Sequence, residues 1–403
     1  RHFEGPDPME ENMNTMMPTY NRIPIRFVRG SGAWLYADNE DKYLDALAGI
    51  AVCGLGHAHP RITKAIADQA STLIHTSNLY EIPLQEELAN RLCELTNMDN
   101  VFFANSGAEA NEAAIKIARR HGDNRGIENP QIIVMEGSFH GRTMATLTAT
   151  GNRKVHAGFE PLLSGFVRAP YNDIQAIEKI ASNKARSVVA VFVEPVLGEG
   201  GVVIPKDNYL QELRRICDEN DWLLMLDEVQ TGNGRTGKYL ACEHSGVVPD
   251  VVTTAKGLGN GLPIGACMAR GIASEILIAG THGSTFGGNP LVCAGALAVL
   301  DELTTGGVIE RAEYLGQRIK TGLEKALDGS NHVKEIRGAG MMIAVEATEP
   351  CPELIQRALE RKLLLNVTAD SVVRLLPPLN LSDEEADQIV EIVTGLVESL
   401  GDE

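Results

Sequence analysis

Apolar residues follow two arrangements along this chain, short continuous runs and stretches with helical spacing. The short runs are rich in Val, Ile, Leu and Phe without clean alternation, which is typical of strands covered on both faces. We predict such strands at 101–104, 131–135, 164–168, 188–193, 222–226, 250–254 and 264–268. Helical stretches such as Tyr209–Glu219 separate several of them. This alternation predicts an α/β fold with a mostly parallel central sheet.

The two ends of the chain carry a mixed pattern and predict a smaller α+β lobe. Further strands are expected at 33–36, 43–44, 341–345 and 372–376, with a long helix after about residue 290 and a last helix at 382–400. We therefore expect a small domain made of 18–61 together with 295–403, and a large domain at 62–294. Residues 1–17 are polar and rich in methionine, so we predict a mobile tail.

Composition and charge narrow the class of protein. The chain has 403 residues, 44% of them hydrophobic, and a formal net charge of −18. That length favours two lobes, and so acidic a chain is a poor ligand for nucleic acid or an anionic membrane. The absence of an apolar run of about 18 residues predicts no membrane span. Seven dispersed cysteines, an odd number, favour reduced thiols in a cytoplasm over disulfides or a zinc site.

A carboxylate and a lysine follow two of the predicted strands. Asp227 ends the apolar run 223–226, and Lys256 follows the run 251–254 within a loop of small residues. Their separation of 29 residues, 256 − 227, is about one β-α-β step, so both groups can lie on one edge of a parallel sheet. A lysine that forms an imine and a carboxylate that faces a protonated ring nitrogen suit a pyridinium cofactor held as a Schiff base.

Two segments are candidates for binding a phosphate. Ser106 and Glu109 form an S-x-x-E capping box, which places Gly107 and Ala108 in the first turn of a helix, where free N–H groups attract anions. An ordinary capped helix is the alternative. The glycine-rich segment 281–290, which contains Ser284 and Thr285, is a second candidate, and a flexible loop before a helix is its alternative.

The segment after the run 131–135 offers an aromatic ring and an arginine. Phe139 or His140 could stack on a flat ring, and Arg142 could hold a carboxylate through two parallel hydrogen bonds. A solvated surface arginine is the alternative. Arg374 interrupts the apolar run 372–376, and an arginine with such neighbours needs a partner or a ligand.

Two glutamates and two histidines complete the set of candidates. Glu194 and Glu199 follow the predicted strand 188–193, so either could face the same sheet edge as Asp227. His57 and His59 lack a third ligand nearby, so ordinary loop histidines are favoured and no metal site is predicted.

In combination, these motifs resemble the class III pyridoxal-phosphate (PLP) aminotransferases of fold type I. The resemblance runs from about Tyr20 to the final helix and rests on the following segments: 106–112, 139–142, 227–230, Lys256 and 283–285. Within that family the chain is most similar to the acetylornithine aminotransferases, with ornithine aminotransferases as near relatives. The resemblance implies that 62–294 is the PLP-binding domain and that the protein is a homodimer with shared active sites.

The resemblance also implies roles in holding the cofactor. Lys256 would form the Schiff base and move the proton, and Asp227 would pair with the ring nitrogen. Gln230 would lie near the phenolic oxygen of the cofactor and Phe139 against its ring. Ser106, Gly107 and Ala108 would bind the phosphate. Ser284 and Thr285 would belong to a loop from which Thr285 reaches the phosphate of the partner subunit's cofactor. Ser77 and Asn78 match a segment that approaches the site across the dimer interface.

For the substrates, the resemblance implies one site that serves two molecules. Arg142 would bind the distal α-carboxylate of an ω-amino donor, and Arg374 the α-carboxylate of 2-oxoglutarate. Glu199 would pair with Arg374 in the first half-reaction and move away in the second, and Tyr20 matches a position at the mouth of the site. The expected donor is N2-acetylornithine, an intermediate of arginine biosynthesis. Ornithine, succinylornithine and 4-aminobutyrate are alternative donors, and a non-catalytic binding protein of this fold is a different class of alternative.

Overall fold

Within the residues that the structure describes, 15–184 and 186–401 of a computed structural model, the central sheet has seven strands. Their order across the sheet is β4 (Asn100–Ala104), β10 (Gly265–Ala269), β9 (Val251–Thr254), β8 (Leu223–Asp227), β7 (Val188–Val193), β5 (Gln131–Met135) and β6 (Phe166–Ala169). β10 is antiparallel to both of its neighbours, and the pairs from β9 to β6 are parallel. The prediction of a mostly parallel central sheet is confirmed, although β6 begins at Phe166 rather than at 164.

Helices cover both faces of this sheet, which explains the continuous apolar runs. On β5, Ile132 and Val134 pack in the same apolar cluster as Ile115 of α4 (Gly107–Asn124). The alternate residue Ile133 belongs to the cluster that contains Leu213 of α8 (Tyr209–Asn220). Successive side chains of a strand point to opposite faces, so a strand buried between two layers needs an apolar residue at every position.

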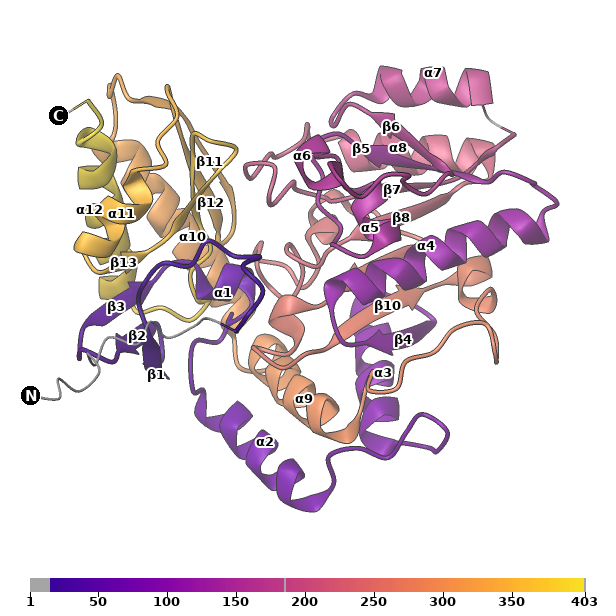
Figure 1. Cartoon of the computed structure of the whole chain (residues 1–403), viewed down its shortest axis with the longest axis horizontal. Helices are drawn as coiled ribbons and strands as arrows, with labels where there is room; N and C mark the ends of the chain where they lie inside the picture. The colour runs from indigo at the N-terminus through magenta and orange to yellow at the C-terminus, as the bar shows by residue number, and fades with distance from the viewer. Residues whose placement is uncertain (1–14, 185, 402–403) are drawn as a thin grey trace, which may run out of the picture.

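Two four-stranded sheets lie beside the central sheet, on the left in Figure 1. One contains β1 (Phe27–Ser31), β2 (Trp34–Ala37), β3 (Lys42–Asp45) and β13 (Leu363–Leu364), and the other contains β11 (Val333–Ala339), β12 (Met342–Ala347), β15 (Val372–Leu375) and β14 (Asn366–Thr368). Because β13 pairs with β3, the two ends of the chain share one sheet. The α+β lobe expected from both chain ends is therefore present, while its boundaries at residues 61 and 295 stay a prediction. The mobile tail also stays a prediction, because residues 1–14 lie outside the described residues.

The remaining helices connect or cover these sheets. They are α1 (Ala48–Ala51), α2 (Pro60–Thr72), α3 (Pro83–Thr96), α5 (Met144–Ala149), α6 (Arg153–His156), α7 (Ile174–Lys184), α9 (Pro290–Thr304), α10 (Val308–Ala326), α11 (Leu354–Glu360) and α12 (Asp383–Glu398), with 3-10 turns η1 (Ala241–Ser245), η2 (Lys256–Leu258) and η3 (Gly271–Glu275). In the described part of the chain, no single helix is long and apolar enough to cross a membrane. The helices α9 and α10 meet the length and composition criteria only when they are taken together, and they are bent by 62° relative to each other. All seven cysteines are free.

Candidate active site

Three neighbouring strands of the central sheet end at one pocket. Asp227 is the last residue of β8, Glu194 follows β7, and Lys256 follows β9 in η2. β8 and β9 are parallel, with Asp227 in register with Thr253, so the two strands deliver their ends to the same edge. A pocket of about 380 Å³ at this edge is lined by these three charged side chains together with Phe139.

Lys256 is the amine in this pocket. Its backbone has φ +38°, an uncommon conformation for a residue with a side chain and one that recurs at functional sites. Burial lowers the pKa of its amine to about 8, and the nearby charge of Glu199 only partly opposes that shift. Among the described residues, the amine has no hydrogen-bond partner. An unengaged amine with a lowered pKa has a larger neutral fraction than an ordinary lysine and is a better nucleophile toward an aldehyde.

Asp227 is held at the bottom of the pocket by three donors. Its Oδ2 accepts a hydrogen bond from Asn111 Nδ2 at 2.8 Å and lies 2.7 Å from His140 Nδ1, while Oδ1 accepts from Val229 N at 2.9 Å. Asn111 is itself fixed, because its Oδ1 accepts a hydrogen bond from Thr253 Oγ1 at 2.6 Å. The carboxylate is therefore fixed in one orientation relative to the pocket.

His140 has a different place from Phe139. The His140 ring is buried, stacks on Phe192 with centroids 4.3 Å apart, and points its Nδ1 at Asp227. The prediction that His140 could stack on a flat ligand is therefore wrong, because its ring packs on Phe192 and contacts Asp227. Phe139 lines the pocket, with Arg142 Cζ 5.8 Å from the centre of its ring.

The N-terminus of α4 forms another side of the pocket. Ser106 is the N-cap and its side chain accepts a hydrogen bond from Glu109 N, but the reciprocal half of the predicted capping box is wrong. The Glu109 carboxylate instead accepts hydrogen bonds from Asn105 N and from Ser106 Oγ, each at 3.1 Å. Gly107 and Ala108 line the pocket, in the first turn of a helix where amides lack intrahelical acceptors. This turn suits an anion.

Both glutamates after β7 reach the pocket. Glu194 is buried and accepts hydrogen bonds from Phe139 N at 2.9 Å and Gly198 N at 3.2 Å. Burial, reinforced by the negative charge of Asp227, raises the pKa of Glu194 to about 7. Glu194 thus ties the backbone of the Phe139 segment to the loop that carries Glu199.

Arg374 and Glu199 form an ion pair between two sheets. Arg374 lies in β15 and is fully buried, and its Nη1 donates to Glu199 Oε1 at 2.8 Å and to Gln230 Oε1 at 3.3 Å. Its Nε donates to Asn366 at 3.1 Å. Burial of Glu199 opposes ionisation, but Arg374 outweighs that effect and holds the pKa of the carboxyl below its usual value. Arg374 Nη2 is buried without a hydrogen-bond partner in the described residues, so the guanidinium retains a donor for a ligand.

Six candidate residues do not line this pocket: Arg374, which lies behind Glu199 and Gln230, and five residues nearer the surface. Tyr20 and Thr285 are exposed, and Ser77, Asn78 and Ser284 lie in neighbouring segments of the surface. Asn78 Nδ2 donates to the carbonyls of Ser284 at 2.9 Å and Gly287 at 3.0 Å, so the two segments are joined. Their roles stay predictions, since those roles involve a second subunit.

Each of the two loop histidines lies near a carboxylate. His57 Nε2 lies 2.8 Å from Asp45 Oδ2, and this hydrogen bond is the main reason that the pKa of His57 rises to about 9. His59 Nε2 lies 3.9 Å from Glu302 Oε2. In the described ranges, no group of three or more His, Cys, Asp or Glu side chains could hold a metal ion.

The pocket fits a planar, phosphorylated aldehyde with a ring nitrogen. The amine of Lys256 suits the aldehyde, the fixed carboxylate of Asp227 suits a protonated ring nitrogen, and the first turn of α4 suits the phosphate. The pocket is narrow beside the N-terminus of α4, because a Cβ on Gly107 would lie 2.6 Å from Val229 Cγ1. PLP has these three groups on one ring.

Comparisons with known proteins agree with this chemistry. Residues 15–397 match the family Aminotransferase class-III. The chain is 57% identical over 385 residues to the acetylornithine aminotransferase of Nitrosomonas europaea, covering 96% of this chain and 98% of that protein. It is 50% identical to acetylornithine aminotransferase 1 of Bordetella pertussis, over 94% of this chain and 96% of that protein. The crystal structure of ornithine aminotransferase from Toxoplasma gondii superposes with a TM-score of 0.92 at 34% identity, covering 96% and 93% of the two chains.

The match extends over almost the whole chain and over nearly the full length of each relative. PLP is the cofactor of this family, and a further structure of the Toxoplasma gondii enzyme is described with PLP at partial occupancy in its active site. The sequence-based predictions of family, fold and cofactor are confirmed. This chain belongs to the class III aminotransferases and is a PLP-dependent transaminase.

Proposed function

We propose that the protein transfers the δ-amino group of N2-acetylornithine to 2-oxoglutarate, yielding N-acetylglutamate 5-semialdehyde and glutamate. The carrying observation is the ion pair between Arg374 and Glu199, because Glu199 lines the pocket that contains Lys256 and Arg374 lies directly behind it. In this pair, Arg374 is a cation that could bind a substrate carboxylate. Glu199 is an anion that could neutralise Arg374 when the substrate end near it is uncharged. The names of the two curated relatives support acetylornithine as the donor and a place in arginine biosynthesis.

Three groups of this chain would hold the cofactor. Lys256 would attach it covalently, Asp227 would keep its ring nitrogen protonated, and the amides of Gly107 and Ala108 would bind its phosphate. When bound, PLP supplies an aldehyde that captures the substrate amine and a ring that withdraws electrons from the carbon that loses a proton. Phe139 would pack against the ring and Gln230 would lie near its phenolic oxygen.

Lys256 would also carry the proton during transfer. The free amine of Lys256 has a pKa of about 8, lowered by burial. An amine whose pKa lies near the working pH accepts a proton at one carbon and returns it at another efficiently. Burial of Lys256 therefore serves both attachment and proton transfer.

The two substrates would bind with opposite ends toward Arg374. The donor presents an uncharged methylene end there, so Glu199 can remain paired with Arg374 while Arg142 binds the distal carboxylate. 2-Oxoglutarate presents a carboxylate there, which would replace Glu199 on the guanidinium. Gln230 and Asn366 would keep Arg374 in place during this exchange, because both accept hydrogen bonds from it.

A homodimer would complete the site. Leu79, Tyr80 and Phe286 are large apolar side chains exposed by 87%, 70% and 60%, and they flank Ser77, Asn78 and Thr285. An exposed apolar patch of this kind is typical of a subunit interface. Thr285 would then reach the phosphate of the partner's cofactor, and Tyr20 would lie at the mouth of the site. Sedimentation equilibrium should give a dimer mass, and a monomer at micromolar concentration would refute this part.

A donor panel tests the proposed substrate. The PLP-loaded protein is mixed with acetylornithine, ornithine, succinylornithine or 4-aminobutyrate alone, and the cofactor absorbance reports each half-reaction. We expect acetylornithine to react with the highest kcat/KM. A preference for 4-aminobutyrate would contradict the proposed donor, because that molecule has the distal carboxylate but lacks the acetylamino group beside it. Ornithine is the second candidate, because the Toxoplasma gondii ornithine aminotransferase has the same fold at 34% identity.

A further inference from the structure

A second cavity, of about 690 Å³, lies between the central sheet and the C-terminal elements. One wall comes from the segment between β7 and α8 together with η1, and the other comes from α10 and the turn between β11 and β12. No described residue lines both this cavity and the active-site pocket. Its volume is typical of sites for small molecules, which span roughly 300–1,000 Å³.

The base of this cavity is a close-packed junction of backbone segments. Gly340 in the β11–β12 turn has φ +55°, and a Cβ there would lie 2.4 Å from the carbonyl carbon of Thr236. On the other side, a Cβ on Gly316 of α10 would lie 2.2 Å from the Gly340 oxygen. Three segments therefore meet at distances that only glycine permits. The cavity above them has a firm base.

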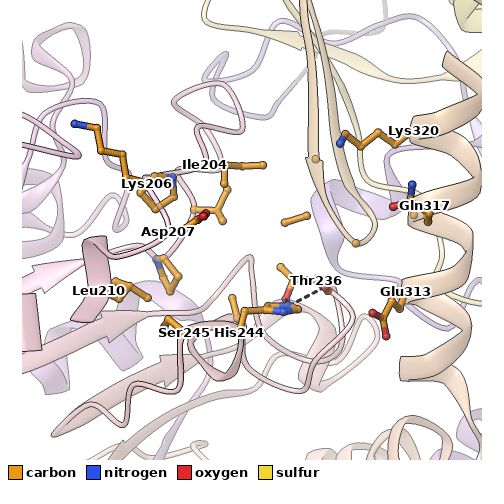
Figure 2. Close-up of a pocket in the computed structure, with 18 of the residues that line it drawn as sticks. Ile204, Lys206, Asp207, Leu210, Thr236, His244, Ser245, Glu313, Gln317 and Lys320 are labelled. Atoms are coloured by element: carbon orange, nitrogen blue, oxygen red, sulfur yellow. Dashed lines mark hydrogen bonds between the residues drawn. The ribbon is translucent and has the colours of Figure 1, made fainter. Parts of the chain in front are cut away.

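Two carboxylates face each other across the cavity. Figure 2 shows Asp207 entering from one wall and Glu313 from the other. Neither forms an ion pair within the part of the chain that the structure describes. Figure 2 also shows the Lys206 ammonium directed away from the cavity, and Lys320 forms an ion pair with Glu324 at 3.3 Å. The charge left to a ligand is therefore negative.

The base of the cavity adds acceptors and apolar surface. His244 Nε2 donates to the Thr236 carbonyl oxygen at 3.0 Å, and the tautomer that makes this bond has Nδ1 as an acceptor. Ile204 lines the cavity with 37% of its surface exposed, and Pro195 and Val196 line it as well. Such a site offers acceptors beside apolar surface, and its unpaired lysine, Lys206, directs its ammonium away from the cavity.

We propose that this cavity binds a small organic cation with an apolar body, such as an alkylammonium or alkylguanidinium compound. The cationic head would lie between Asp207 and Glu313 and donate to His244 Nδ1, while the alkyl part would cover Ile204 and its apolar neighbours. The proposal is independent of the aminotransferase reaction, because the cavity contains none of the residues assigned to that reaction.

Three probes of equal chain length test the class of ligand. Calorimetry on the PLP-loaded protein at pH 8 and low salt compares hexylguanidinium, hexanol and hexanoate. Hexylguanidinium carries a cation with N–H donors, and it lacks the primary amine that would react with the cofactor. We expect it to bind about tenfold more tightly than hexanol, as charge-assisted hydrogen bonds predict. Equal binding of the cation and the alcohol, or tighter binding of hexanoate, would overturn the proposal.

Two variants test the location. Asp207→Asn and Glu313→Gln should each weaken hexylguanidinium binding by about three- to tenfold, a moderate loss because both side chains are partly screened by water. Glu310→Gln, an exposed control on the same helix α10 and outside the cavity, should leave the affinity unchanged. An unchanged affinity in both cavity variants, or an equal loss in the control, would overturn the proposed site. All three variants should keep wild-type turnover with acetylornithine and 2-oxoglutarate, which separates failure of this site from failure of the proposed function.

Discussion

The base and the wall of the active-site pocket are held in different ways. The base is the set Asp227, His140 and Asn111, all buried and joined by hydrogen bonds of 2.7–2.8 Å to one carboxylate. The wall is the ion pair of Glu199, in the loop after β7, with Arg374 of β15 at 2.8 Å. A buried network joined by several hydrogen bonds is costly to rearrange, whereas a partly exposed carboxylate can give up its partner to a ligand. We therefore propose that the molecule combines a rigid cofactor site with an adjustable substrate site.

The largest effect should come from removing the amine of Lys256. In Lys256→Ala, we expect steady-state turnover of acetylornithine and 2-oxoglutarate to fall by about 10⁴-fold or more, because both covalent attachment and proton transfer are lost. Lys238→Ala is the matched control, since Lys238 is exposed and outside the pocket. Turnover within about tenfold of wild type would contradict the role of Lys256.

A smaller but still large effect is expected from Asp227→Asn. The amide cannot supply the charge that keeps the ring nitrogen protonated, and its NH2 group would face the Asn111 donor, so the first half-reaction should slow by about 10³-fold. Stopped-flow absorbance with acetylornithine measures this rate. Asp218→Asn on the exposed side of α8 serves as the control. A rate close to that of wild type would show that a negative charge at position 227 is not required.

The pH dependence of cofactor attachment tests how burial acts on Lys256. Burial lowers the pKa of this amine from 10.5 to about 8, so the neutral, nucleophilic form should predominate above pH 8. The rate at which PLP-free protein captures PLP should therefore rise about tenfold per pH unit below that pKa and become level above about pH 9. A rate that continues to rise to pH 10 would indicate an ordinary lysine.

The smallest expected effect concerns the proposed partner contribution. Thr285→Val should weaken PLP binding by about fivefold, because one hydroxyl donor to the phosphate is lost. Fluorescence titration of the PLP-free protein measures the affinity, with Thr321→Val on the exposed side of α10 as the control. An affinity equal to that of the control would remove Thr285 from the site.

The placement of Asp227 and Lys256 could be predicted because it depends on local pattern. Apolar runs reveal buried strands, and adjacent parallel strands bring their ends to one edge. The same reasoning placed Glu194 and Glu199 beside them. These features require only the order of elements along the chain.

The partners of Asp227 could not be assigned in the same way. Asn111 lies on the buried face of α4, where a polar residue among alanines was a signal, but its acceptor is more than 100 residues away in sequence. His140 could be read as a stacking residue or as a partner, and packing on Phe192 decides between them. β14 and β11 are short or partly exposed, so they lack the apolar runs that reveal a strand.

The most direct test of the rigid base and adjustable wall is the half-reaction of Glu199→Ala with two donors. Rates are measured with acetylornithine and with glutamate, in the variant and in wild type. Since Arg374 would be permanently free for an α-carboxylate, the ratio of the glutamate rate to the acetylornithine rate should rise by about tenfold or more. An unchanged ratio would contradict the account, because it would mean that Glu199 does not control access to Arg374.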